Sequence, residues 1–175
     1  AAAIAYERVL GCVVHASTFV PEPGHVQHKM GRGLIVGEPR GGRSDRAQQV
    51  VELLVHAGFE ATLSTDVRHD VWYKLWGNMT MNPVSAITGA TADRILADPL
   101  VRGFNSAAMI EAAAIGARIG CPIEQDAEAR HAITAKLGAF KTSMLQDVEA
   151  GRPIELDAIV GAVHEIGRRV AVPTP

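Results

Sequence analysis

One stretch of the sequence, from Val71 to Ala92, limits the possible folds more than any other. It reads VWYKLWGNMTMNPVSAITGATA, and Lys74 is its only charged residue. A helix over this stretch would be apolar on nearly all sides, so neighbouring helices must cover it. We therefore expect a helical body, with helices over 66–88, 98–119, 124–149 (interrupted near Gly138) and 154–169.

The residues before this body have a different character. Val9–Val20 is a long apolar and β-branched run, and shorter apolar runs follow at Val26–Met30 and Leu34–Val36. Glycine and proline separate the runs, a pattern that predicts three short strands in a meander.

A helix should come next, with Ser44 as its N-cap and Gly58 just past its end, and then a strand over Phe59–Leu63. The domain boundary is expected near 64–66. The predicted fold class is mainly α, an all-helical C-terminal domain preceded by a short β/α segment.

Composition disfavours several classes of protein. The 175 residues carry a formal net charge of −2 and only 5% aromatics, which argues against a nucleic-acid surface. No apolar run approaches about 18 residues, so no membrane span is expected. Cys12 and Cys121 are predicted to be buried free thiols in a reducing compartment, which favours the cytoplasm. His25 and His28 lack a third ligand of matching spacing, so no metal site is predicted.

Polar residues recur every four positions in the apolar helix. Lys74, Asn78 and Asn82 fall on a stripe about 80° wide, and Ser85 lies on the same stripe. A lysine that lines a desolvated cavity has a lowered pKa and can protonate an alkoxide. Pro83 should add a kink. An equally good explanation is a lysine that caps a neighbouring helix, with both asparagines in ordinary interhelical hydrogen bonds.

A second polar cluster lies in 141–157, which reads KTSMLQDVEAGRPIELD. Gly151 suits a helix end, and Pro153 suits the first turn of the next helix, which would also contain Glu155. A carboxylate is favoured there by the helix dipole. On the residues alone, Glu155 is best explained as an ordinary helix-end charge and Ser143 as a structural hydroxyl.

The two segments together resemble the two signatures of the ketopantoate reductases. The first is Trp72-x-Lys74-Leu75-x-x-Asn78-x-x-x-Asn82-Pro83, and the second runs from Ser143-Met144-Leu145-Gln146-Asp147 to Ile154-Glu155-Leu156-Asp157. The strands at the head resemble the last strands of that family's nucleotide-binding domain. The resemblance implies that residues 1–65 are the C-terminal portion of a Rossmann-type NADP-binding domain and that 66–175 are the helical substrate domain.

The resemblance also implies a role for each matching position. Lys74 matches the general acid, and Asn78 and Asn82 match substrate-binding amides. Ser143 matches the hydroxyl at the carboxylate end of the substrate. Glu155 matches the glutamate on the cofactor side, which helps to place the lysine.

The implied activity is the NADPH-dependent reduction of 2-dehydropantoate, a small 2-oxoacid, with a homodimer as the expected assembly. Family members can carry a further substrate-binding asparagine where this chain has Ala92. The sequence contains no G-x-G-x-x-G, so the main cofactor site should lie outside the chain, and the isolated chain should be inactive. The alternatives are a paralogous reductase of another 2-oxoacid and a non-catalytic helical dimerisation domain.

Overall fold

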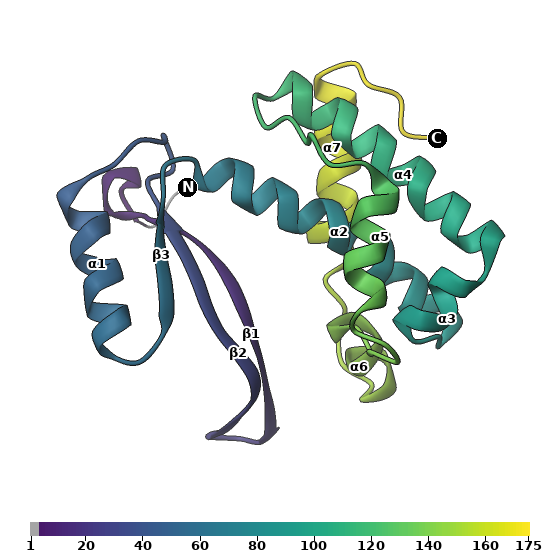
Figure 1. The fold of residues 1–175 in the computed structure, drawn as a ribbon, viewed down its shortest axis with the longest axis horizontal. Coiled ribbons are helices and arrows are strands. Elements are labelled where there is room, and N and C mark those ends of the chain that lie inside the picture. Colours follow the sequence, from purple (N-terminus) through teal and green to yellow (C-terminus); the bar gives the residue numbers. More distant parts are fainter. Residues whose placement is uncertain (1–3) are drawn as a thin grey trace. The chain divides into compact units, whose positions relative to one another are not determined.

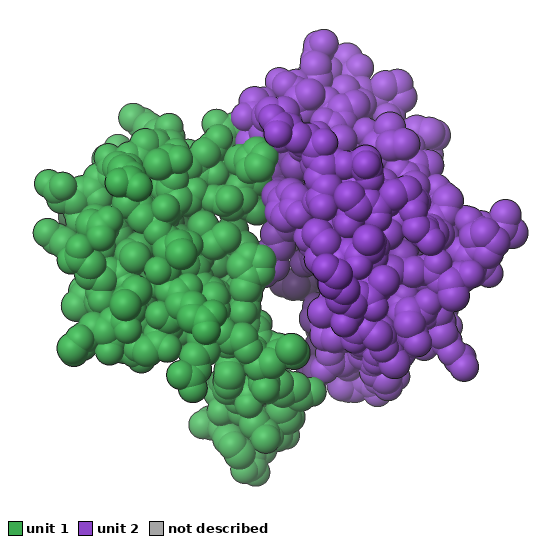
Figure 2. Space-filling view, viewed as in Figure 1, with its two compact units in different colours: residues 1–71 green, residues 72–175 purple. Residues whose placement is uncertain are grey.

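The structure is a computed structural model and describes residues 4–175. The chain divides into two compact units, residues 1–71 and 72–175 (Figure 2). The first unit holds a short 3-10 turn, η1 (Tyr6–Arg8), and the second consists of helices and their connections. The predicted fold class, mainly α with a short β/α head, is confirmed.

The first unit is a sheet of three strands with one helix. Its elements are β1 (Gly11–Glu22), β2 (His25–Gly37), α1 (Asp45–His56) and β3 (Glu60–Ser64), and the strand order is β1-β2-β3. β1 and β2 form an antiparallel hairpin, whereas β2 and β3 are parallel and α1 connects them (Figure 1). The expected three-strand meander is wrong, because its second and third strands form one strand, β2; the expected helix and strand follow, and the helical crossover lets β3 run parallel to β2.

Two of the predicted short strands merge into the single strand β2. Gly31 lies between them with φ +74°, and a Cβ there would collide with the carbonyl oxygen of His15. Glycine thus allows a bulge rather than a chain reversal, and the ladder to β1 shifts register beside it. The Ser44 cap is confirmed, since its hydroxyl accepts from the Ala47 amide at 3.2 Å, and Gly58 has φ +91° just past α1.

The second unit is built around α2 (Val67–Thr88), which begins in the first unit and continues through Pro83 without interruption. Trp72 and Trp76 pack with Met109 and Ile115 in the main core, and the Trp76 indole donates to the Met109 carbonyl at 2.7 Å. This burial explains why Lys74 is the only charged residue of α2 from Val71 onward. The remaining elements are α3 (Ala92–Ala97), α4 (Pro99–Arg118), α5 (Ala127–Ala135), α6 (Ser143–Glu149), η2 (Asp157–Gly161) and α7 (Ala162–Arg169).

Two helix predictions need correction, and one predicted interruption is confirmed. The short helix α3 was not predicted, and it precedes α4 because the Asp98 carboxylate caps a new helix at Leu100 and Val101. The interruption near Gly138 is confirmed, since residues 136–142, where Gly138 has φ +61°, separate α5 from α6. The last helix begins after Glu155, not before it, with η2 forming a wide π-type turn that leads into α7. None of the helices within residues 4–175 is both long enough and apolar enough to cross a membrane.

Candidate active site

The α2 stripe is polar and partly buried, and the side-chain amides of its two asparagines have no partner within residues 4–175. Lys74 and Asn78 are half-buried, and Asn82 is only 6% exposed. Within residues 4–175, neither asparagine side chain makes a hydrogen bond to another group of the chain. Interhelical hydrogen bonds therefore do not explain these amides. Because buried amides normally have partners, their donors and acceptors are suited to a ligand.

The C-terminal part of the stripe is joined to the second polar cluster. Ser85 is fully buried, and its hydroxyl donates to the Asn82 carbonyl at 2.9 Å and shares a short hydrogen bond with the Thr142 hydroxyl. Thr142 also caps α6 by accepting from the Leu145 amide at 3.1 Å. Ser143, the first residue of α6, is exposed directly beside this junction. The structure thus brings Asn82 and Ser143 into one neighbourhood across 60 residues of sequence.

Glu155 is placed less definitely. It is exposed, and its carbonyl accepts from the Ile159 amide at 3.1 Å at the start of the last helix. Its carboxylate forms no hydrogen bond or ion pair within residues 4–175. No contact in this part of the chain joins it to Lys74, so its role stays a prediction.

A half-buried arginine that the sequence did not single out lies beside the N-terminal part of the stripe. The guanidinium of Arg130, from α5, sits 4.9 Å from the centre of the Tyr73 ring and donates to the Tyr73 hydroxyl at 3.3 Å. It also rests against Gly77, where an added Cβ would lie 2.8 Å from Nη2. A glycine inside a helix was the one available signal, because it allows close approach of another group.

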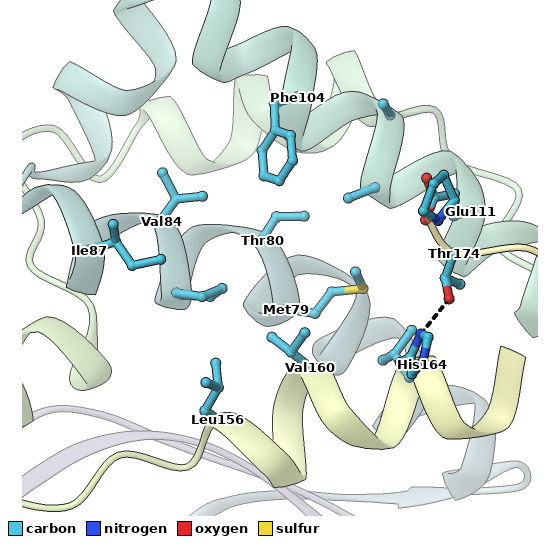
Figure 3. A pocket seen from close by; sticks show the side chains of 15 residues that line it. Met79, Thr80, Val84, Ile87, Phe104, Glu111, Leu156, Val160, His164 and Thr174 are labelled. Atoms are coloured by element: carbon cyan, nitrogen blue, oxygen red, sulfur yellow. Dashed lines mark hydrogen bonds between the residues drawn. The ribbon is translucent and has the colours of Figure 1, made fainter. Parts of the chain in front are cut away.

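A large groove of the second unit has a different chemistry. It holds about 540 Å³ and is almost wholly apolar (Figure 3). Its α2 residues are Met79, Thr80, Pro83, Val84 and Ile87. At about 100° per residue, these five face roughly away from the Lys74 stripe. The groove is completed by α4, by the last helix and by the chain end, where His164 pairs with Thr174 at 2.7 Å. Because the groove faces away from the Lys74 stripe and is mostly apolar, its size does not identify the chemistry.

Metal chemistry has no evident place in the part of the chain that the structure describes. Over residues 4–175, no three side chains of His, Cys, Asp or Glu gather closely enough to hold a metal ion. His28 instead pairs with the Gly31 carbonyl oxygen at 2.6 Å, and His25 lies 3.5 Å from Glu22.

Comparison with known proteins decides the family. The model of the ketopantoate reductase PanE/ApbA C-terminal domain matches residues 66–175, the part that contains the stripe and the Ser143 junction. The chain belongs to the ketopantoate reductase family. A 2-dehydropantoate 2-reductase of Mesorhizobium japonicum is 44% identical over 169 residues, which is 97% of this chain and 52% of that protein.

Solved structures of the family agree with this fold. A ketopantoate reductase-like protein from Ralstonia solanacearum MolK2 is 58% identical, with a TM-score of 0.94 over 98% of this chain and 52% of that one. The 2-dehydropantoate 2-reductase of Methylococcus capsulatus is 31% identical, with a TM-score of 0.87 over 94% of this chain and 53% of that one. The chain therefore spans about half the length of the relatives it matches.

Proposed function

We propose that the protein containing this chain reduces 2-dehydropantoate to pantoate with NADPH, in the cytoplasm, as a step of pantothenate biosynthesis. The observation that carries the proposal is the pair of unengaged amides, Asn78 and Asn82, on the same face as Lys74 in a member of this family. In this proposal, residues 1–65 are the end of a Rossmann-type nucleotide-binding domain and 66–175 supply the substrate side.

Each residue of the site has a separate task. When bound, the nicotinamide cofactor would supply a hydride to C2 of the oxoacid. Lys74 would hold the ketone oxygen and give it a proton as negative charge develops there. The amides of Asn78 and Asn82 would bind the polar end of the substrate, and the exposed Ser143 hydroxyl its carboxylate end. These contacts orient a small, flexible molecule before reaction.

The residues present fit only the edge of a dinucleotide site. The exposed Glu155 carboxylate is available to accept a hydrogen bond from the cofactor. The sequence contains no G-x-G-x-x-G, the turn that binds a pyrophosphate at a helix N-terminus. One or two hydrogen bonds, each worth about 1 kcal/mol, do not offset the several kcal/mol lost on immobilising a dinucleotide.

The 175-residue chain alone should therefore be inactive. Calorimetric titration with NADPH should give no micromolar binding, and a coupled assay with 2-dehydropantoate should give no turnover. The outer strands β1 and β3 leave sheet edges that invite pairing, so sedimentation should show self-association. Tight NADPH binding with turnover would place the cofactor site within this chain and overturn the assignment of residues 1–65.

The proposal as a whole is tested in the full-length protein. Lys74→Ala should lower kcat by about 10²–10⁴-fold, the effect of losing a general acid. Asn82→Ala and Ser143→Ala should act mainly on KM. A Lys74→Ala enzyme with near-native turnover would contradict the mechanism. A wild-type full-length protein without any 2-oxoacid reductase activity would instead favour the alternative of a non-catalytic helical dimerisation domain.

A second candidate, a paralogue acting on another 2-oxoacid, is favoured by Ala92. This residue is 1% exposed and packs with Met81, Ile95 and Leu96, so a methyl group stands where relatives can have a substrate-binding amide. Comparing kcat/KM for 2-dehydropantoate with kcat/KM for oxoacids that lack its hydroxyl group tests this candidate. A preference for the oxoacids without the hydroxyl group would support it.

A further inference from the structure

Within residues 4–175, the guanidinium of Arg130 has no counter-ion. Its Nε is buried and makes no hydrogen bond, and no carboxylate of this part of the chain lies within ion-pair distance. The one hydrogen bond of the guanidinium to residues 4–175 runs from Nη1 to the Tyr73 hydroxyl, which in turn donates to Gln125 at 2.6 Å. Partly buried charges are normally paired, so this guanidinium is suited to interact with an anion that the described chain does not supply, such as a bound ligand.

The neighbouring acids on α5 and at its N-terminus are engaged with other groups. Glu128 forms an ion pair with Arg102 of α4. Asp126 caps α5, with its carboxylate accepting from the Ala129 amide at 2.6 Å. The positive charge of Arg130 is therefore not cancelled by the acids closest to it in sequence.

The guanidinium is held in a fixed place next to the stripe. It stacks on Tyr73 and fills the space left by the missing side chain of Gly77, so that a Cβ at this position would lie 2.9 Å from Nε. Gly77 immediately precedes Asn78, and it lies one helical turn after Lys74, where side-chain positions are about 5–6 Å apart. A glycine inside a helix costs about 1 kcal/mol relative to alanine. Here the missing side chain leaves the space that the Arg130 guanidinium occupies.

We propose that Arg130 is a specificity-determining residue that makes the Lys74 site select ketones carrying a negative charge. The inference rests on the proposed function and names the substrate class of that same site. Arg130 acts through its electrostatic field, while Ser143 and the two asparagines make the directional contacts. The positive charges of Arg130 and Lys74 together favour binding of a 2-oxoacid over that of an uncharged ketone of the same shape.

The test compares charged and uncharged substrates in the full-length reductase. The kcat/KM of a 2-oxoacid is measured beside that of its 2-oxoamide, which keeps the carbon skeleton and loses the charge; competition gives binding where the amide turns over slowly. Arg130→Gln should lower the value for the acid about tenfold, the effect of one charge at about 8–10 Å in a partly hydrated site, and that for the amide less than twofold. Arg130→Lys should keep most of the preference.

Two further variants keep the result interpretable. Gly77→Ala keeps the charge of Arg130 but displaces its guanidinium from the space beside Gly77. This variant should therefore lose part of the preference for the acid over the amide. Arg102→Gln removes an arginine that Glu128 already neutralises and should leave the preference unchanged. Thermal unfolding of each variant shows whether it is folded.

If Arg130→Gln lowers kcat/KM equally for the acid and the amide, Arg130 has only a structural role and the inference is overturned. If this variant lowers kcat/KM for neither substrate, the inference is also overturned. Failure of the wild-type protein to reduce any 2-oxoacid would instead overturn the proposed function.

Discussion

The two faces of α2 carry opposite kinds of surface on one helix. One face presents Lys74 together with Asn78 and Asn82, and the side-chain amides of the two asparagines form no hydrogen bonds within residues 4–175. The other face forms the wall of a mostly apolar 540 Å³ groove, where Ile87 is 84% exposed (Figure 3). In the proposed function, the chemistry lies with the polar face of α2 rather than with the groove.

The largest expected difference between the two faces of α2 comes from adding one negative charge to each face in turn and comparing kcat/KM. Asn78→Asp puts a carboxylate one turn from Lys74, where it would raise the pKa of the lysine and repel an anionic substrate. In the full-length protein, kcat/KM should fall on the order of 100-fold. Ile87→Asp changes an exposed groove residue and should alter kcat/KM less than threefold. Comparable losses in the two variants would remove the distinction between the faces.

The junction between α2 and α6 should give a smaller effect. Ser85→Ala removes the hydrogen bonds to Thr142 and to the Asn82 carbonyl, so it should cost about 1–3 kcal/mol in the free energy of unfolding. Because Ser143 follows Thr142 directly, KM should rise while kcat changes little. Thr88→Ala, which removes an exposed hydroxyl bonded to the Val84 carbonyl at 2.7 Å, is the matched control. A rise in KM in both variants would show that the junction does not place Ser143.

The smallest effect concerns pH and a part of the second unit that belongs to neither face. His131 is 2% exposed and pairs with the Ser106 hydroxyl at 3.0 Å, and burial lowers its pKa below the usual 6.5. The unfolded chain therefore takes up a proton first as the pH falls below about 6.5, so folding stability should decrease from there until the folded pKa is reached.

Chemical denaturation between pH 7.5 and pH 5 measures this dependence. Replacing His131 with Gln should flatten it, whereas His164→Gln, at an exposed histidine, should not. A His131→Gln protein with an unchanged pH dependence would show that another group is responsible.

The sequence predicted the features that depend on local chemistry. Helix α2 followed from a long apolar stretch with one charge, and Ser44 and Gly58 marked the ends of α1 correctly. The family resemblance, which the comparisons bear out, rested on two short motifs. The polar stripe needed only helical spacing, although whether its amides were already satisfied could be read only from the structure.

The features that escaped prediction depend on contacts distant in sequence. Gly31 looked like a strand end because a glycine of positive φ suits both a turn and a bulge, and only pairing with β1 decides between them. The break between α3 and α4 depends on the Asp98 carboxylate accepting hydrogen bonds from the Leu100 and Val101 amides, which the sequence pattern did not reveal. Arg130 is an ordinary helical arginine in sequence, and its contact with Gly77, 53 residues earlier, depends on how α5 packs in the folded chain.

Rebuilding the ammonium group at position 74 tests the central claim most directly. Cys12 is exposed, not buried as the sequence predicted, so it is replaced by Ser. In this full-length protein, Lys74→Cys should lower kcat by about 10²–10⁴-fold. Alkylation with 2-bromoethylamine converts the new thiol into a lysine analogue, and kcat for the 2-oxoacid should then recover by at least tenfold. The same treatment of an Ile87→Cys protein should change nothing. A Lys74→Cys enzyme that turns over normally, or that stays inactive after complete alkylation confirmed by mass spectrometry, would contradict the assignment of Lys74 as the proton donor.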